Sequence, residues 1–516
     1  MPTITTNEAY ETEYTINTEP MYGAKRDVGA DADLIFQNNT LCPHAYSIPR
    51  SERTDFTNRN TYSIDPPGCE DADDAFSLFI DESKDNALFL AIHIADPTEF
   101  VSPAIESALW ADIKERVVTR YPSNRAPVHL MPKDVVDRAS LMVNQYGDTK
   151  NAITVLTEID PDTFAPRGRI QLLFSTVRVC AAHALTYARA AEMVQNATEP
   201  DPDNDMATTI ARGLCVASAL HQRRVASTVG ASLSDLAPSM VVFSSPPVGI
   251  HLARASDTVL DMQKMIAEFA IFANAFVGEH LKIHMGGMGI FRTCSTGGWI
   301  DTVAAGISGE DLLNEIIVNG IQADYLSENA AHDLVGMPEY CHFTSPIRRL
   351  SDCVCHYLVK YIHLCATTDA TTERVATGLV NPFPDNSLTV LADMCQRGAK
   401  SMRKLQYRDT KFRLLQTMNQ MLISLPHRSI NLTFFITGYT GGFLNLIVCR
   451  IDEHKVHMSY SLRLKNFPYD QIRENESDGT VTHTQYTIPV THVNCLGKFD
   501  SGSIPELDAY VAQLGA

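Results

Sequence analysis

Two short apolar runs in the first hundred residues predict neighbouring buried strands. The first is Ala-Phe-Ser-Leu-Phe-Ile at 75–80, and the second is Ala-Leu-Phe-Leu-Ala-Ile-His-Ile-Ala at 87–95. The turn-type residues 81–86 between them are typical of a hairpin. His93 lies inside the second run, where a histidine is more often a hydrogen-bonded core residue than a catalytic group.

The middle of the chain has the spacing of amphipathic helices. Apolar side chains repeat at helical intervals over residues 206–226 and 258–281. Glu268 and Asn274 interrupt the second segment. Because buried polar side chains need hydrogen-bond partners, we expect structural partners for both.

Two further helices are predicted towards the C-terminal side. Ser345 is a suitable N-cap and Pro346 a suitable first residue for one of them. The other follows Ser387 and covers 388–416. The apolar stripe of the earlier helix runs through Ile347, Leu350, Val354, Leu358, Tyr361 and Cys365.

The two ends of the chain differ from its middle. Residues 1–40 are polar and lack periodicity, so we expect a partly disordered arm. After residue 425, short β-type runs predict a small antiparallel barrel of the OB type, at 432–436, 444–449, 456–459 and 481–489. The expected fold class is α+β: an antiparallel sheet packed with helices over 41–425, followed by an OB-like β-barrel and tail over 426–516.

Composition describes an ordinary soluble protein. The chain has 516 residues, 45% hydrophobic and 20% charged, enough for two or three domains. No run of eighteen apolar residues predicts a membrane span, and the polar start lacks the features of a signal peptide. The 12 scattered cysteines fit a reducing, cytoplasmic location. The net charge of −19 does not by itself indicate a nucleic-acid partner.

The stretch between residues 65 and 75 is rich in carboxylates and lies between two β-type runs. Carboxylates crowded in a dry site repel one another and favour hard divalent cations. Two such ions roughly 3.5–4 Å apart form the clamp used for phosphodiester cleavage. The alternative is a solvated acidic turn. An EF-hand loop is excluded because its twelfth position would be Phe76. The carboxylates are Asp65, Glu70, Asp71, Asp73 and Asp74.

Tyr121 begins a stiff segment that has three prolines, at positions 122, 127 and 132. A tyrosine held on a stiff loop suits stacking on a nucleic-acid base. Packing at the edge of the core is an equally good explanation from this segment alone.

Arg348 and Arg349 fall in the first turn of the helix predicted after Ser345. The positive end of the helix dipole disfavours cations there, so an anion such as phosphate would explain them. The alternative is a weak ion pair of Arg348 with Asp352. One helix cannot bring zinc-type side chains together, so zinc is disfavoured for Cys353, Cys355, His356, His363 and Cys365.

Basic residues concentrate on the helix predicted over 388–416. In a chain of net charge −19, such a stripe favours a nucleic-acid backbone, although a solvated basic face is the simpler alternative. The members at helical spacing are Arg397, Lys400, Lys404, Arg408 and Lys411.

Four motifs together resemble the ribonuclease II / RNase R family, whose catalytic module is called RNB. They are Ile64-Asp65, Glu70 to Ala75, His93 to Asp96 and His342 to Arg349, in the family's order. The likeness spans about residues 41 to 415, and a weaker likeness links the terminal barrel to the S1-type OB domain.

The resemblance implies a hydrolytic 3′→5′ exoribonuclease that degrades single-stranded RNA to nucleoside 5′-monophosphates with magnesium. Two ions are expected, with manganese as an alternative. Asp65 and Asp74 would bind metal most directly, while Asp71 and Asp73 would complete the site and help to activate water. Arg348 would hold the scissile phosphate, and Tyr121 would stack on the terminal base. The expected catalytic residues are Asp73 and Arg348; the expected RNA-binding residues are Tyr121, Arg348, Arg397, Lys400, Lys404 and Arg408.

Departures from the family pattern leave alternatives open. About 40 N-terminal residues cannot form the cold-shock barrels that family members usually carry, so a protein partner could take their place on an expected monomer. An RNA-binding or regulatory protein of the same fold with reduced catalysis is the alternative function, and DNA is an alternative substrate.

Overall fold

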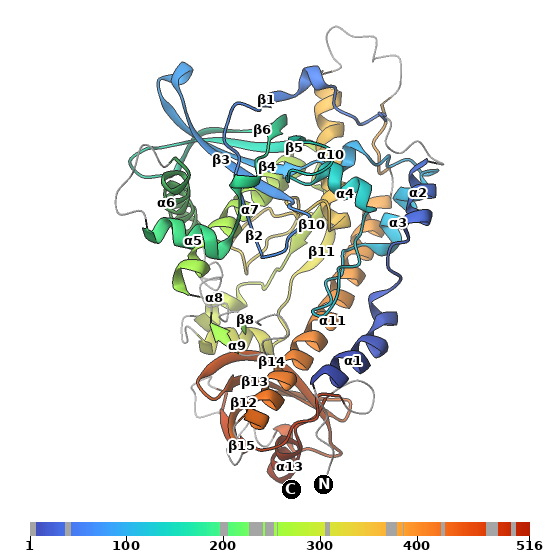
Figure 1. The fold of residues 1–516 in the computed structure, drawn as a ribbon, viewed down its shortest axis with the longest axis vertical. Helices are drawn as coiled ribbons and strands as arrows, with labels where there is room; N and C mark the ends of the chain where they lie inside the picture. The colour runs from blue at the N-terminus through green and yellow to red at the C-terminus, as the bar shows by residue number, and fades with distance from the viewer. Residues whose placement is uncertain are drawn as a thin grey trace.

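The computed structural model describes most of the chain, and Figure 1 shows its arrangement. Among these residues, no helix is both long and apolar enough to cross a membrane. The described ranges are 7–36, 43–196, 205–226, 241–242, 252–254, 256–304, 310–367, 379–384, 386–424, 429–470, 483–496 and 502–515.

A five-stranded sheet forms the centre of the larger part of the molecule. Its order is β1-β6-β5-β4-β3, and all neighbours are antiparallel except β1 and β6. Every residue of β4 is buried, which confirms the second apolar run as a core strand. The bounds are β1 Thr54–Phe56, β3 Asp74–Asp81, β4 Ala87–Ala95, β5 Thr149–Ile159 and β6 Pro166–Arg178.

His93 is a core residue of β4. Its ring nitrogens lie 3.0 Å from the Ser77 hydroxyl and 2.8 Å from the Thr154 hydroxyl, on the two neighbouring strands. Burial lowers the pKa of His93 to about 3, so the ring is neutral at physiological pH. The structural explanation of this histidine is confirmed.

Helices α5, α6 and α7 pack together beside the sheet, to the left in Figure 1. Glu268 of α7 accepts a hydrogen bond of 3.2 Å from Arg224 Nε of α6. Asn274 Oδ1 accepts a 2.8 Å bond from the Phe343 amide. Both polar residues therefore have the structural partners expected of them. The bounds are α5 Tyr187–Asn196, α6 Asp205–Val225 and α7 Asp257–His284.

Smaller elements surround these layers. Two-stranded sheets join β2 to β7, β8 to β9 and β10 to β11. The strands are β2 Ser63–Asp65, β7 Ala184–Thr186, β8 Val241–Val242, β9 Ala253–Arg254, β10 Met288–Thr293 and β11 Asp324–Glu328. The helices are α3 Ala108–Arg116, α4 Lys133–Ala139, α8 Trp299–Ala304, α9 Glu310–Val318 and α10 Leu350–Thr367.

Helix α10 begins later than its sequence predicted. Residues 346–348 form a turn, and the helix starts at Leu350. The Ile347 amide donates to Asp73 Oδ1 at 2.8 Å, and Arg349 forms a β-bridge with Val118. These long-range bonds hold the segment out of the helix. Arg348 and Arg349 therefore precede the helix, and their placement in its first turn was wrong.

Helix α11, Ser387–Ser424, is 38 residues long and connects the two parts of the molecule. In Figure 1 it runs diagonally from beside the upper sheet to the C-terminal sheet. Its first half packs in the core of the central sheet through Leu388, Leu391 and Cys395. Its second half packs in a separate core through Phe412 and Leu415. The helix predicted over 388–416 is confirmed and extends further.

The C-terminal part is a four-stranded antiparallel sheet of the order β14-β13-β12-β15, followed by one helix. It resembles an OB-like barrel, as the short β-type runs predicted. Residues 481–482 of the fourth predicted strand lie outside the described residues, and that strand is observed at 486–490. The bounds are β12 Ile430–Thr440, β13 Phe443–Ile451, β14 His454–Arg463, β15 Tyr486–Val490 and α13 Pro505–Leu514.

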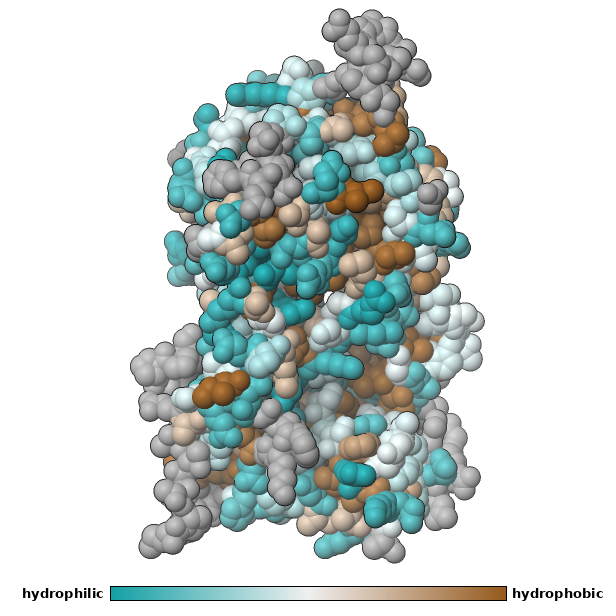
Figure 2. All heavy atoms as spheres, turned by 90° about the vertical axis from the view of Figure 1, so that its right-hand side faces the viewer, coloured by the Kyte–Doolittle hydropathy of each residue, from teal (hydrophilic) through white to brown (hydrophobic). Residues whose placement is uncertain are grey.

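The N-terminal segment contains helices α1, Asn7–Tyr22, and α2, Val28–Phe36, where the sequence predicted a partly disordered arm. The Tyr14 ring stacks on Phe412 of α11 with 3.8 Å between ring centroids. Tyrosine hydroxyls and a buried carboxylate hold α1, so a search for apolar periodicity missed it. On the face that carries α2 and α3, hydrophilic residues are interspersed with small hydrophobic patches (Figure 2).

Gly398 of α11 lies against a strained turn next to the Arg348 segment. Val117 has a φ of 65°, and its carbonyl accepts a 2.9 Å bond from the Leu350 amide. A Cβ at position 398 would meet Val117 Cγ1 at 2.5 Å and Val117 Cβ at 3.0 Å. We expect Gly398→Ala to lower the free energy of unfolding by about 1–3 kcal/mol, measured in urea, because the turn cannot move independently.

Gly29→Ala on α2 is the matched control, since its new Cβ would meet nothing closer than Asp27 Oδ1 at 3.4 Å. It should show no loss of stability. Equal unfolding midpoints for the two variants would contradict the close packing at Gly398.

Candidate active site

The acidic loop connects β2 to β3 and is closed at its base by backbone pairing. Tyr62 and Phe76 exchange hydrogen bonds of 2.9 and 2.8 Å. Gly68 has a φ of +79°, in the left-handed region that favours glycine. Asp65 ends β2 and Asp74 begins β3, so the strands place both ends of the loop at one edge of the central sheet.

Arg348 reaches this loop from the segment before α10. Its Nε donates to Asp73 Oδ2 at 2.9 Å, and its Nη2 donates to the Ser345 hydroxyl at 3.0 Å. The Asp73 side chain is 3% exposed, whereas that of Arg348 is 44% exposed. The guanidinium therefore has one edge on the carboxylate and the remainder available to a ligand.

Arg349 has a different partner. Its Nε and Nη2 donate to the two carboxylate oxygens of Asp352, each at 2.9 Å. The ion pair of Arg348 with Asp352 that the sequence left open is not what the structure shows, because Arg349 occupies that carboxylate.

The carboxylates of the loop, of which Asp73 is buried and Asp65 and Asp74 are partly buried, carry more negative charge than their surroundings balance. Burial is the largest cause that raises the pKa of Asp65 to about 6, that of Asp74 to about 7 and that of Asp73 to about 8. The charge of Asp65 raises the pKa of Asp74 further, and Arg348 opposes these shifts. A cation bound among them would favour their ionised forms.

Tyr121 lies over the same loop. Its hydroxyl donates to Asp71 Oδ2 at 3.0 Å, and its side chain is 38% exposed. The Cys69 thiol approaches Asp71 Oδ1 at 3.7 Å, and His129 Nδ1 lies 3.9 Å from Asp71 Oδ2. The sequence alternative of a tyrosine packed only on the core edge does not describe this contact.

The four aspartates suit a hard divalent cation by their chemistry, because they are oxygen donors in a crowded and partly buried site. Asp71 and Asp73, however, are bonded to Tyr121 and Arg348 as they stand. Within the described ranges, no three His, Cys, Asp or Glu side chains are arranged to hold one ion, and this includes the cysteines and histidines of α10. Metal binding would therefore require these contacts to rearrange.

Among the residues that the structure describes, no hydrogen bond or ion pair joins the basic stripe of α11 to the carboxylates of the acidic loop. Arg397 pairs with Asp393 at 2.8 Å on the exposed face, and Lys400 and Lys404 are also exposed. Arg408 contacts Met21 of α1. A role in RNA binding for these four residues stays a prediction.

Two residues near the site were not identified as functional from sequence. Tyr187 begins α5, and burial together with the charges of Asp74 and Asp65 raises its pKa to about 12. Asn274 bonds the Tyr340 and Thr344 hydroxyls at 3.2 and 3.4 Å and so orients the segment that leads to Arg348. The position of Asn274 in an otherwise apolar helical stripe was a signal in the sequence. Nothing in the sequence pattern indicated Tyr187.

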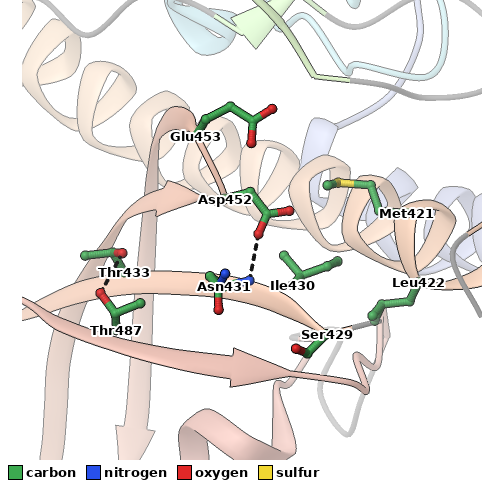
Figure 3. A pocket seen from close by; sticks show the side chains of 9 residues that line it. All are labelled: Met421, Leu422, Ser429, Ile430, Asn431, Thr433, Asp452, Glu453 and Thr487. Atoms are coloured by element: carbon green, nitrogen blue, oxygen red, sulfur yellow. Dashed lines mark hydrogen bonds between the residues drawn. The ribbon is translucent and has the colours of Figure 1, made fainter. Parts of the chain in front are cut away.

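A separate pocket lies between the end of α11 and the C-terminal sheet (Figure 3). It has a volume of about 480 Å³, and its two charged lining residues, Asp452 and Glu453, are both acidic. Asp452 Oδ1 accepts a 2.8 Å bond from the Asn431 amide. This lining includes no cation that could contact a phosphate, whereas the acidic loop has the half-exposed Arg348 beside it, so the loop is the better candidate for the active site.

Comparison with known proteins identifies a family whose model covers the acidic loop. The model of the RNB domain family matches residues 53–363, more than half of the chain. The exosome complex exonuclease RRP44 homolog A of Arabidopsis thaliana is 25% identical over 352 residues, which cover 60% of this chain and 35% of that protein. Ribonuclease R of Chlamydia pneumoniae is 24% identical over 382 residues, which cover 64% and 52%. The chain thus spans only part of these relatives.

Solved structures share the fold. Mycoplasma genitalium RNase R in complex with ribose-methylated single-stranded RNA has a TM-score of 0.64 at 16% identity, covering 86% of this chain and 69% of that one. Yeast Ssd1, described as a pseudonuclease, has a TM-score of 0.57 at 16% identity, covering 81% and 51%. The fold alone therefore accommodates both an RNase and a pseudonuclease.

Proposed function

The chain belongs to the RNB domain family, and from this premise we propose that it is a hydrolytic 3′→5′ exoribonuclease. It degrades single-stranded RNA to nucleoside 5′-monophosphates. The observation that carries the proposal is the contact of the half-exposed Arg348 guanidinium with buried Asp73, beside three more aspartates. Such a set can hold a phosphodiester through the cation and direct a water through the carboxylates.

Each side chain has a proposed role. Asp65 and Asp74 would hold the metal most directly, and Asp71 and Asp73 would complete its site once their present contacts rearrange. Arg348 would bind the scissile phosphate. Magnesium, or manganese in its place, would supply charge neutralisation and an activated water when bound. Asp73 orients Arg348 and helps to remove the proton from the water.

The remaining substrate contacts are also proposals. Tyr121 stacks on the terminal base. The hydrogen bond of its hydroxyl to Asp71 fixes the orientation of the ring for this contact. Arg397, Lys400, Lys404 and Arg408 attract the strand from α11. The remaining calls stay predictions: a monomer, a protein partner, a cytoplasmic location, and domain boundaries near residues 40 and 425.

The test is release of nucleotides from uniformly labelled single-stranded RNA with magnesium, beside a circular RNA and a DNA of the same sequence. We expect 5′-monophosphates from the linear RNA and no product from the circle. Cleavage of the circle would indicate an endonuclease, and equal cleavage of DNA would remove the restriction to RNA. Binding of RNA without any product would favour the alternative of a regulatory protein with reduced catalysis. The hydrogen bonds of Asp71 to Tyr121 and of Asp73 to Arg348 fit that alternative too, because they occupy two of the carboxylates.

Metal addition should stabilise the protein more at pH 8 than at pH 6. The pKa values of Asp65, Asp73 and Asp74 are raised on folding, so the protonated forms favour the folded state and that stability is lost as the pH rises through about 6 to 8. Magnesium binds the ionised forms and opposes the loss. Thermal unfolding with EDTA and with magnesium at both pH values measures this.

The control is Asp162→Asn, an exposed carboxylate on the β5–β6 turn, which should leave the magnesium effect unchanged. An increase in unfolding temperature that is the same at both pH values would contradict a site built from these three carboxyl groups.

A further inference from the structure

One face of α10 holds the segment that leads to Arg348. Its Asp352 carboxylate accepts a 2.8 Å hydrogen bond from the Ser345 amide. One turn later, His356 Nε2 lies 3.0 Å from the Phe343 carbonyl oxygen. Because a carbonyl only accepts hydrogen bonds, Nε2 must carry the hydrogen. The helix therefore fixes the backbone of this segment at two points before Arg348.

His356 is fully buried, and its ring is confined by two neighbours. The side chains of His356 and Asp96 have no exposed surface, and His356 Nδ1 lies 4.0 Å from Asp96 Oδ1, beyond hydrogen-bond distance. The imidazole also packs on the Phe343 ring, with 4.4 Å between the ring centroids. Confinement on two sides keeps the Nε2 hydrogen directed at the Phe343 carbonyl.

Asp96 belongs to a buried cluster of charged side chains that joins α10 to the end of β4. Lys360 Nζ and Arg53 Nη2 donate to its carboxylate at 2.8 and 3.0 Å. Both cations also pair with Glu99, so two acids balance two bases. Burial would raise the pKa of Asp96, but opposing contributions, of which the charge of Lys360 is the largest, hold it well below the usual range. Ion pairs between ionised groups therefore attach α10 to the sheet.

The same end of β4 also holds the acidic loop. The Ala95 amide, next to Asp96, donates to the Asp73 carbonyl at 2.8 Å. One unit, made of the β4 end, the charged cluster and α10, thus holds the backbones of both Asp73 and Phe343. Arg348 Nε donates to Asp73 Oδ2 at 2.9 Å. This unit therefore fixes the chain on both sides of the contact between the guanidinium and the carboxylate.

We propose that His356 is a positioning residue, which places Arg348 relative to Asp73 through its hydrogen bond to the Phe343 carbonyl. Misplacement of a group that holds the reacting phosphate slows the chemical step more than it weakens the binding of a strand with several other contacts. The inference rests on the proposed function for the phosphate that Arg348 holds, but the position of the segment can be measured without RNA. A packing role alone would affect stability and leave this segment in place.

The first experiment measures steady-state release of nucleotides from RNA with magnesium, using variants of the full chain. His356→Leu removes the N–H donor, so kcat should fall about tenfold or more while KM for RNA changes by less than about threefold. His356→Gln places an N–H near the former Nε2 and should recover kcat to within about threefold of the wild type. Wild-type kcat in His356→Leu, or no recovery in His356→Gln, would overturn the role of the hydrogen bond.

Tyr357→Phe is the matched control on the same helix. It removes a buried hydroxyl that donates to the Val101 carbonyl at 2.6 Å, and it leaves the Phe343 carbonyl untouched. We expect reduced stability in urea together with the kcat of the wild type. An equal fall in kcat for Tyr357→Phe and His356→Leu would show that general loosening of α10 is the cause, which would overturn the proposal.

The second experiment measures hydrogen exchange of the full chain by mass spectrometry, without RNA and without added metal. Peptides that contain residues 343–348 should exchange about tenfold faster in His356→Leu than in the wild type, His356→Gln or Tyr357→Phe. Unchanged exchange in these peptides would contradict the proposal. If His356→Leu does not fold, His356→Asn replaces it, because the shorter amide places its nitrogen near Nδ1 and leaves the Phe343 carbonyl without a donor.

The two proposals fail differently. Faster exchange in His356→Leu, with no release of nucleotides by the wild type, would support the positioning of the segment and remove the exoribonuclease proposal. Release of nucleotides by the wild type, with equal kcat and equal exchange in His356→Leu, would remove only the positioning role.

Discussion

Asp73→Asn is expected to reduce the release of nucleotides by a factor on the order of 10³ while RNA binding persists. The side chain keeps an oxygen for the Ile347 amide, which donates to Asp73 at 2.8 Å, so the segment that carries Arg348 should keep its position. What is lost is the negative charge that Arg348 Nε contacts at 2.9 Å and that a metal and a water would need. Single-turnover kinetics and fluorescence anisotropy measure the two effects separately.

Stability should change less than activity. The Arg348 side chain is 44% exposed, so water screens the charge that the substitution leaves unpaired. Asp162→Asn provides the same chemical change at an exposed turn and should retain full activity. Equal rates for Asp73→Asn and the wild type would contradict the catalytic role of Asp73. If the variant neither folds nor binds RNA, the role of Asp73 is structural.

Asp409→Asn is expected to lower the free energy of unfolding by about 2–3 kcal/mol, because one buried carboxylate accepts three hydrogen bonds. The Tyr22 hydroxyl donates to its Oδ2 at 2.5 Å, the Ser123 amide donates to the same atom at 2.9 Å, and the Tyr14 hydroxyl donates to its Oδ1. An amide offers one acceptor oxygen in place of two. Denaturant unfolding of the full chain measures the loss.

The same variant tests a positioning role. Ser123 lies two residues from Tyr121, so the carboxylate of Asp409 connects α1 to the loop that carries this tyrosine. We expect KM for RNA to rise several-fold with a smaller change in kcat. Tyr14→Phe removes one of the three donors and should have an intermediate effect on stability. Asp261→Asn, an exposed carboxylate on α7, is the control and should be neutral. A loss of stability without any change in KM would limit Asp409 to holding α1.

Local patterns were sufficient for the elements whose signal lies in adjacent residues. The helices α6 and α7 and the short C-terminal strands follow from the apolar pattern. The hairpin of β3 and β4 also needed its turn residues, and α11 followed from its N-cap and the helical spacing of its basic residues. The start of α10 did not follow, since a carboxylate 274 positions away takes the Ile347 amide. Helix α1 was missed for a related reason, because its attachment depends on hydroxyl groups.

The residues of the candidate site likewise divide into those that the sequence identified and those that only the packing brings together. The acidic loop and Arg348 were identified because their motifs are continuous in sequence, and the structure brings Asp73, Asp71, Arg348 and Tyr121 into contact. Their functional roles stay predictions. Asn274 and the segment that leads to Arg348 are far apart in the chain, so only the packing of α7 brings Asn274 to the Phe343 amide.

The shared second core means that the C-terminal sheet does not have a complete apolar interior of its own. Tyr14 of α1 and Phe412, Leu415 and Met418 of α11 contribute to the cluster that also contains Leu432 and Val448. A recombinant fragment that begins at Ser429 would expose the face that these side chains cover, and we expect it to precipitate. Extending the fragment back to include only the second half of α11, which packs in this core, should restore part of its solubility.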